Sequence, residues 1–165
     1  MVQGLIITML FDEEMMLLAI EEAKKAAEIG EVPVGAVIVD EAGEVISTGY
    51  NLRETENRPT AHAEIVAIEK AALVRKSWRL TGCTLYVTLE PCPMCAGAAW
   101  CARVPRIVIG ARDARSGALG SLIDLNSYPL NHRPELTFGV LETECREIIQ
   151  KFFSVRREKK RTAEE

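Results

Sequence analysis

The sequence has no apolar run that approaches the roughly 18 or more residues of a membrane-spanning helix, so we expect no contact with a membrane. Its opening residues lack the basic segment and the small-residue cleavage site of a secretory signal. We therefore expect a cytoplasmic protein. Internal repeats, long linkers and low-complexity segments are missing as well, so the expectation for 165 residues is one domain around one core.

The sequence also has little net charge and few cysteines. The formal charge is −4, from 20 basic and 24 acidic residues, so any basic surface that binds nucleic acid must be local. The five cysteines are odd in number, and Cys92 and Cys95 form a C-x-x-C pair. This pattern indicates a metal or redox site in a reducing compartment and argues against a disulfide framework.

What the sequence does contain is typical of a folded globular domain, with 48% apolar and 27% charged residues. Apolar spacing predicts a first helix over 12–29, with Asp12 as its N-cap. Turn signals and alternation predict the remaining elements, which are strands at 33–39 and 45–50, a helix at 60–74, a strand at 83–89, a helix at 93–101, strands at 106–111 and 136–140, and a helix at 143–157.

This order of elements favours an α/β fold, a layered mixed sheet with helices on its faces. The domain is expected to span 12–157. Residues 1–11 form an N-terminal extension of doubtful order, and 158–165 form a charged C-terminal tail that is expected to fray.

The most specific chemical signal is a set of metal-ligand residue types at the starts of two predicted helices. His62-Ala63-Glu64 opens one helix and Pro91-Cys92-Pro93-Met94-Cys95 opens the next. One imidazole and two thiolates suit Zn²⁺ and leave the fourth tetrahedral position for water, as in catalytic zinc sites. Cys101 would lie roughly 9 Å along the helix from Cys95 and cannot easily share the ion.

Cys83 and Cys145 have apolar neighbours, and we interpret them as core residues. An ion beyond the N-termini of both helices can be reached by His62 and Glu64 from both sides, although residues two apart diverge on a helix. Glu64 is then placed to handle the protons of the water. The alternatives are a pair of core or redox thiols at Cys92 and Cys95 and a hydrogen-bonded core histidine at His62. A redox pair would not require His62 and Glu64.

H-x-E followed by P-C-x-x-C resembles the signature of the zinc-dependent nucleoside and nucleobase deaminases, the cytidine/deoxycytidylate deaminase superfamily. TLYVTLEPCPMCAGA at 84–98, GARDARSGALGS at 110–121, NHR at 131–133 and FFSVRR at 152–157 narrow the resemblance to the bacterial tRNA-specific adenosine deaminases. The resemblance covers 12–157. It implies a single-domain, three-layer cytidine-deaminase-like fold with a five-stranded mixed sheet.

The resemblance also implies an activity, namely hydrolytic conversion of the wobble adenosine of a tRNA anticodon to inosine, usually in the arginine tRNA, by a homodimer that holds one Zn²⁺ per chain. Matched residue by residue, His62, Cys92 and Cys95 are the zinc ligands and Glu64 is the proton shuttle. The residues that the resemblance assigns to the substrate pocket are Glu31, Val32, Asn51, Ala63, Asp113 and Phe153. For Asn51 and Asp113, ordinary turn chemistry is the alternative.

The C-terminal end carries a local basic excess. Residues 151–165 include six basic and three acidic side chains. Phe152 and Phe153, together with Arg156, Arg157, Lys159, Lys160 and Arg161, combine stacking surface with phosphate-binding charge, as expected at a single-stranded RNA loop. The alternative is a packed helix end with a solvated tail, and for Phe152 we favour a place in the core.

Two other functions remain open from the sequence. A zinc deaminase of a free base or nucleoside, such as guanine or cytosine, would use the same four residues. A non-catalytic, zinc-stabilised RNA-binding module would explain the metal ligands, but it leaves Glu64 and the open coordination position unexplained.

Overall fold

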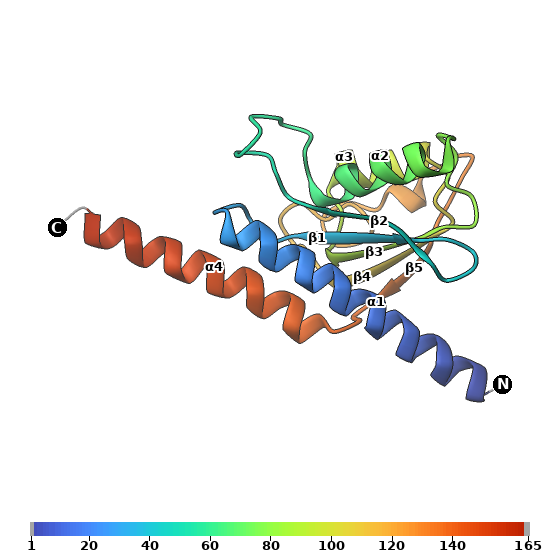
Figure 1. The fold of residues 1–165 in the computed structure, drawn as a ribbon, viewed down its shortest axis with the longest axis horizontal. Helices are drawn as coiled ribbons and strands as arrows, with labels where there is room; N and C mark the ends of the chain where they lie inside the picture. Colours follow the sequence, from blue (N-terminus) through green and yellow to red (C-terminus); the bar gives the residue numbers. More distant parts are fainter. Residues whose placement is uncertain (1, 164–165) are drawn as a thin grey trace.

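The computed structural model describes residues 2–163, which form four α-helices, a short 3-10 helix and one five-stranded sheet (Figure 1). The helices are α1 (Val2–Glu28), α2 (Ala63–Arg75), α3 (Pro93–Cys101) and α4 (Glu142–Ala163), with the 3-10 helix η1 at Leu125–Ser127. The strands are β1 (Gly35–Val39), β2 (Val45–Tyr50), β3 (Thr84–Leu89), β4 (Arg106–Ala111) and β5 (Glu135–Phe138).

The sheet is mixed, in the order β2-β1-β3-β4-β5. β1 pairs antiparallel with β2 and with β3, whereas β3, β4 and β5 run parallel. The parallel β3–β4 pair requires a crossover, which α3 supplies. The five-stranded mixed sheet flanked by helices is therefore confirmed.

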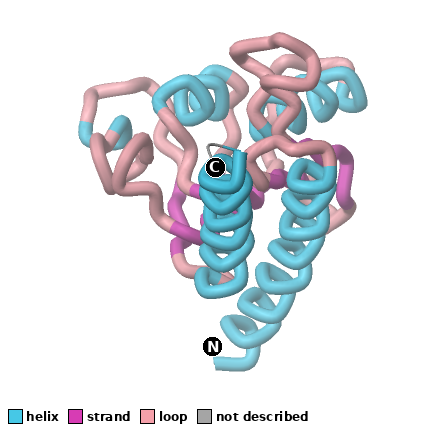
Figure 2. The backbone as a smooth tube through the Cα atoms, turned by 90° about the vertical axis from the view of Figure 1, so that its left-hand side faces the viewer, coloured by secondary structure: helices cyan, strands magenta, loops and turns pink. Residues whose placement is uncertain are grey.

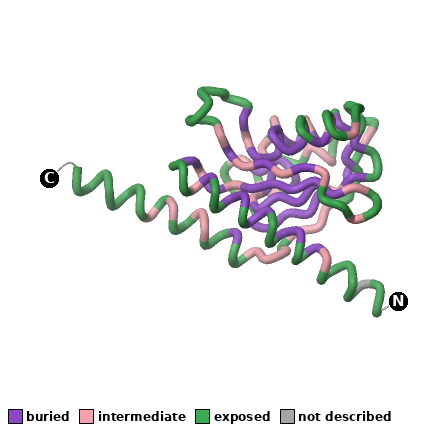
Figure 3. Tube along the Cα trace, viewed as in Figure 1, coloured by how far each residue is buried: buried purple, intermediate pink, exposed green. Residues whose placement is uncertain are grey.

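Helices cover both faces of the sheet, so that the domain has three layers (Figures 1 and 2). Side chains alternate along β1, where Ala36 and Ile38 pack under α2 and α3, and Val37 and Val39 pack on the side of α1 and α4. One buried core lies on each face of the sheet, while the N-terminal part of α1 and the C-terminal part of α4 are exposed (Figure 3).

The strand directions gather the segments that form the site at one edge of the sheet. Because β2 and β3 are both antiparallel to β1, they run in the same direction, and β4 runs parallel to them. Their carboxyl ends therefore lie at the same edge, where ligands commonly bind in open α/β sheets. Asn51, Glu90 and Arg112 directly follow these three strands.

Gly49 lets α2 approach the sheet closely. A Cβ atom at this position would lie 2.4 Å from the carbonyl oxygen of Ala63 and 2.8 Å from the nitrogen of Ala67. Only glycine fits against the first turn of α2 without displacing it. The close contact places the N-terminus of α2, which carries His62 and Glu64, directly over the end of β2.

The N-terminal boundary of the first helix was predicted wrongly. α1 begins at Val2 and not at 12, so residues 2–11, the described part of the segment that was expected to be an extension of doubtful order, are helical. Asp12 is no N-cap but is buried within α1, where its carboxylate accepts hydrogen bonds from the Tyr86 hydroxyl at 2.9 Å and from both terminal nitrogens of the Arg106 guanidinium.

The C-terminal boundary differs in the same way. α4 continues through Ala163, so the part of the predicted tail at 158–163 is helical and exposed. Residues 164–165 lie outside the described residues. Phe152 is half-buried and belongs to neither core cluster, contrary to the expectation of a core position. None of the helices within 2–163 is both long and apolar enough to cross a lipid bilayer.

Candidate active site

The metal-ligand candidates stand at the starts of two neighbouring helices. His62 is the N-cap of α2 and Cys92 is the N-cap of α3, both with extended backbone. Neither side chain caps its helix, so both are free to bind an ion. Cys95 and Glu64 follow within the first turns. The positive ends of two helix dipoles therefore meet at this point, as the sequence predicted.

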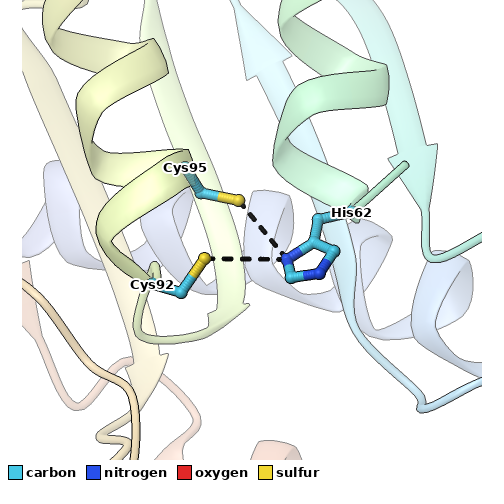
Figure 4. A group of neighbouring side chains, drawn as sticks. All are labelled: His62, Cys92 and Cys95. Atoms are coloured by element: carbon cyan, nitrogen blue, oxygen red, sulfur yellow. Dashed lines mark hydrogen bonds between the residues drawn. The ribbon is translucent and has the colours of Figure 1, made fainter. Parts of the chain in front are cut away.

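Three ligand atoms converge in a geometry that fits Zn²⁺ (Figure 4). The Nδ1 atom of His62 lies 3.7 Å from the Sγ atom of Cys92 and 3.6 Å from the Sγ atom of Cys95. Zinc bonds of about 2.0 Å to nitrogen and 2.3 Å to sulfur at a tetrahedral angle place N and S about 3.5 Å apart. All three ligand atoms lie within 4.8 Å of one another, so the site needs little rearrangement to hold the ion.

The other cysteines take no part. Cys101 is exposed, whereas Cys83 and Cys145 are buried in the two cores. Within residues 2–163, His62, Cys92 and Cys95 are the only group of three or more such side chains that could hold a metal. The prediction that the C-x-x-C pair joins His62 agrees with this arrangement, and Cys83 and Cys145 lie in the cores as expected. A structural role was also expected for Cys101, but its exposed position does not support one.

The electrostatics favour binding of a cation. The pKa of the Cys92 thiol is lowered to about 4, because its sulfur accepts a hydrogen bond from the Cys95 thiol and also contacts His62. The same hydrogen bond, together with burial, raises the pKa of Cys95, and the contact with Cys92 raises the pKa of His62. A thiolate, the form that binds metals, is thus present at neutral pH.

Glu64 is a buried carboxyl beside the ligands. Burial raises its pKa to about 7, and the neighbouring imidazole of His62 opposes the shift. A group whose pKa lies near the working pH can both accept and return a proton, as a general acid and base must.

A pocket with a volume of about 1130 Å³ opens above these residues. The segments that follow β2 and β4 line it, together with residues of α4. Val32, Asn51, Ala63, Asp113 and Phe153, which the resemblance assigned to the substrate pocket, line this pocket, and their contact with a substrate stays a prediction. Glu31 is fully buried and does not itself line it. Its carboxylate accepts a hydrogen bond from the backbone N–H of Thr55, 2.6 Å away, and so holds the loop that follows Asn51.

Asn51 and Asp113 combine a pocket position with turn chemistry. The amide of Asn51 donates to the carbonyl of Val32 at 3.3 Å, and its oxygen accepts from the backbone N–H of Arg53 at 3.2 Å. The carboxylate of Asp113 accepts from the backbone N–H of Arg115 at 2.9 Å and from the hydroxyl of Ser116. Both side chains are therefore held rigidly at the pocket edge.

The basic residues at the pocket differ from the predicted set. Of the five basic residues that the sequence suggested between 156 and 161, only Arg157 lines the pocket. The lining residues that sequence reasoning did not single out include the basic Arg53, Arg112, Arg115, Arg146 and Lys151 and the acidic Glu90 and Glu147. A helical stripe along α4 and the arginines of the segment at 110–121 were the signals that could have identified them.

Comparisons with known proteins agree with this site. Residues 9–111 match the cytidine and deoxycytidylate deaminase zinc-binding region. The chain is 52% identical to a tRNA-specific adenosine deaminase of Bacillus subtilis, over 92% of this chain and 94% of that protein. It is 49% identical to that of Haemophilus influenzae, over 92% and 88%.

Solved structures extend the comparison. One, from work on A-to-I editing by tRNA:A34 deaminases at the wobble position, has 44% identity and a TM-score of 0.79 over 82% of this chain and 98% of its own. A guanine deaminase from Bacillus subtilis has 33% identity and a TM-score of 0.58 over 72% and 86%. The chain belongs to the cytidine and deoxycytidylate deaminase family and, within it, to the group of tRNA-specific adenosine deaminases.

Proposed function

We propose that this protein hydrolyses adenosine to inosine at the wobble position of a tRNA anticodon, with Zn²⁺ held by His62, Cys92 and Cys95. The observation that carries the proposal is the buried Glu64, which stands beside three zinc-ligand side chains at the floor of a pocket with a basic edge. The close relatives that bear the name of this activity support the same substrate.

When bound, Zn²⁺ supplies a Lewis acid that lowers the pKa of the attacking water. Glu64 accepts the proton of that water and delivers it to the ring nitrogen of adenine. The oxygen of the deprotonated water bonds to C6 of the adenine. Glu64 then takes the proton of the new C6 hydroxyl and passes it to the C6 amino group, so that the C6–N bond breaks and ammonia leaves, and adenosine and water give inosine and ammonia. Burial raises the pKa of Glu64 above its usual range, which brings its two protonation states closer together in free energy at neutral pH and suits it to both directions of proton transfer.

The lining of the pocket favours RNA over a free base. A nucleotide must leave its stack to reach a buried site, and Val32, Asn51 and Ala63 line the pocket together with His62 and Glu64, where its base would bind. The lining also includes Arg115, Lys151 and other cations, which suit the phosphates of neighbouring nucleotides. A free base would need no such cations.

A turnover assay decides among the three functions. We expect an anticodon stem-loop RNA to be deaminated, and free guanine, cytosine and adenosine to react at least about 100-fold more slowly, because they forgo the phosphate contacts. Turnover of a free base at the higher rate would favour the alternative that the related guanine deaminase suggests. RNA binding without any inosine would indicate a non-catalytic RNA-binding module.

The finer assignments belong to the same proposal. We propose an arginine tRNA as the substrate, the cytoplasm as the compartment, and a homodimer as the working form. Exposed apolar side chains support the dimer, because Leu122, Ile123 and Tyr128 surround η1, which packs against α3. Sedimentation of the purified protein measures the oligomeric state.

The basic edge of the pocket has a measurable salt signature. The combined substitutions Arg115→Gln, Lys151→Gln and Arg157→Gln are expected to weaken RNA binding and to reduce the slope of log K against log salt by about 2, or about 0.7 for each phosphate that is no longer bound. The matched control changes Arg156, Lys159 and Arg161, which carry the same charge on α4 but do not line the pocket. Equal slopes for the two triple variants would contradict this assignment.

Phe153 is the exposed aromatic residue at the pocket. Its side chain is 38% exposed and packs edge-on against Phe152 with the ring centres 5.4 Å apart. We expect Phe153→Ala to weaken RNA binding by about 1 to 3 kcal/mol because a stacking surface is removed, with zinc content unchanged. Phe152→Ala is the control, because that ring does not line the pocket and its removal should lower the melting temperature instead. If Phe153→Ala binds RNA as tightly as the wild type, the ring of Phe153 serves only the packing of the end of α4.

A further inference from the structure

Glu90 is a buried carboxylate that the chemistry above does not use. It follows β3, lies two residues before Cys92, and is only 2% exposed. Its Oε1 atom accepts hydrogen bonds from the backbone N–H groups of Leu119 and Ser121, each at 3.1 Å. Its Oε2 atom accepts from the backbone N–H of Asp113 at 3.2 Å and from the hydroxyl of Ser121.

These donors all come from one segment, residues 112–121, which we call the rim loop. Among the described residues no lysine or arginine forms a salt bridge with Glu90, so the rim loop itself satisfies the buried charge. The backbone N–H of Ala118, in the same loop, also donates a hydrogen bond to the carbonyl of Pro91 at 2.9 Å. It is therefore wrapped around the residues that lead into the metal ligands.

Gly117 shows how closely the rim loop surrounds the carboxylate. A Cβ atom at this position would lie 2.5 Å from the Cδ atom and 2.7 Å from the Oε1 atom of Glu90. It would also lie 2.5 Å from the carbonyl oxygen of Asp113. A larger residue at 117 would push the loop and the carboxylate apart without removing the charge.

We propose that Glu90 is a positioning residue that holds the rim loop at the edge of the pocket, so that Arg112, Asp113 and Arg115 meet the RNA in register with the zinc ligands. Those three residues line the pocket, whereas the donors Leu119 and Ser121 do not. One residue thus joins the two parts of the site, since its main chain leads to Cys92 and its side chain holds the loop. This inference rests on the proposed function for its substrate.

The substitution Glu90→Gln is expected to affect the two ends of the rim loop differently. Glutamine keeps one acceptor oxygen, which satisfies two backbone donors if it faces Leu119 and Ser121. Its NH₂ group then faces the N–H of Asp113, where two donors meet and no hydrogen bond can form. We therefore expect release of the Asp113 end of the rim loop, with the Leu119 end retained.

Amide hydrogen exchange of the full-length zinc protein tests this directly and does not depend on activity. In Glu90→Gln, exchange at Asp113 should accelerate at least about tenfold, while Leu119 and Ser121 change less. In the same protein, KM for the anticodon stem-loop should rise at least about tenfold, with kcat within about threefold of the wild type and with zinc content unchanged. Gly117→Ala keeps the carboxylate of Glu90, and it should likewise raise KM while leaving kcat nearly unchanged.

Asp12→Asn is the matched control, because Asp12 is a buried carboxylate hydrogen-bonded to Arg106 and Tyr86, away from the pocket. It should lower the melting temperature and leave KM unchanged. The proposal is overturned if exchange at Asp113 is unchanged in Glu90→Gln, if zinc is lost, or if Asp12→Asn raises KM equally. Absence of turnover by the wild-type protein would instead contradict the proposed function, and the exchange result would still decide the role of Glu90.

Discussion

Glu64→Gln is expected to lower kcat on anticodon stem-loop RNA by roughly 10²- to 10⁴-fold, the contribution typical of a general acid and base. The amide keeps the shape of the carboxyl and cannot transfer the protons. Burial already favours the neutral form of the Glu64 carboxyl, which the amide matches in size and shape, so glutamine should fit the same buried position. Zinc content and RNA affinity should therefore remain those of the wild type.

Single-turnover kinetics, metal analysis and RNA binding measured on one preparation check this prediction. Glu22→Gln is the matched control, since Glu22 is a buried glutamate of α1 that pairs with Lys25 and does not line the pocket. It should keep full turnover. A Glu64→Gln protein that deaminates at a rate near that of the wild type would show that another group moves the protons.

Loss of either cysteine ligand is the second change with a large expected effect, in this case on the zinc content of the protein. Cys92→Ala and Cys95→Ala should each reduce zinc from about one ion per chain to nearly none and abolish turnover, because two ligands cannot hold the ion in a tetrahedral site. Both proteins should also melt at a lower temperature, since binding of the ion to the native state stabilises it. Metal analysis and thermal unfolding measure the two effects.

Cys101→Ala provides the control, because Cys101 is a cysteine of the same helix, α3, with an exposed side chain. It should retain zinc, stability and turnover. Treatment of the wild-type protein with a chelator should reproduce the melting temperature of Cys95→Ala. Full zinc content in either ligand variant would exclude these three side chains as the ligand set.

The zinc ligands could be predicted from the sequence because their geometry depends on local features. His62 and Cys92 each stand at a helix start, and short spacings place Glu64 and Cys95 in the first turns. The mixed sheet could be predicted as well, since β-strands separated by helices leave few arrangements. The two helix starts meet because β2 and β3 run in the same direction, and this shared direction follows from the arrangement of the sheet.

Long-range contacts were beyond the reach of the same reasoning. Asp12 has the residue type of an N-cap, but its partner Arg106 is 94 residues away, and only the folded chain shows that the carboxylate is buried. Glu90 was missed for the same reason, because its donors lie 23 to 31 residues later in a loop without regular periodicity.

The end of α4 shows a different limit. Residues 158–163 are charged and exposed, a pattern that also fits a frayed tail. Glutamate, lysine and arginine are nevertheless good helix formers, so α4 continues without any burial to support it. Apolar periodicity cannot locate such an end, since no apolar face is present there.

The most direct test of the proposed function is sequencing of an arginine tRNA after incubation with the purified, zinc-loaded protein. Inosine pairs as guanosine during reverse transcription, so conversion of the wobble adenosine is read as a change from A to G at that single position. We expect this change with the wild-type protein and its loss with Glu64→Gln at equal zinc content. An unchanged adenosine at the wobble position, with zinc bound and the RNA bound, would contradict wobble deamination by this protein.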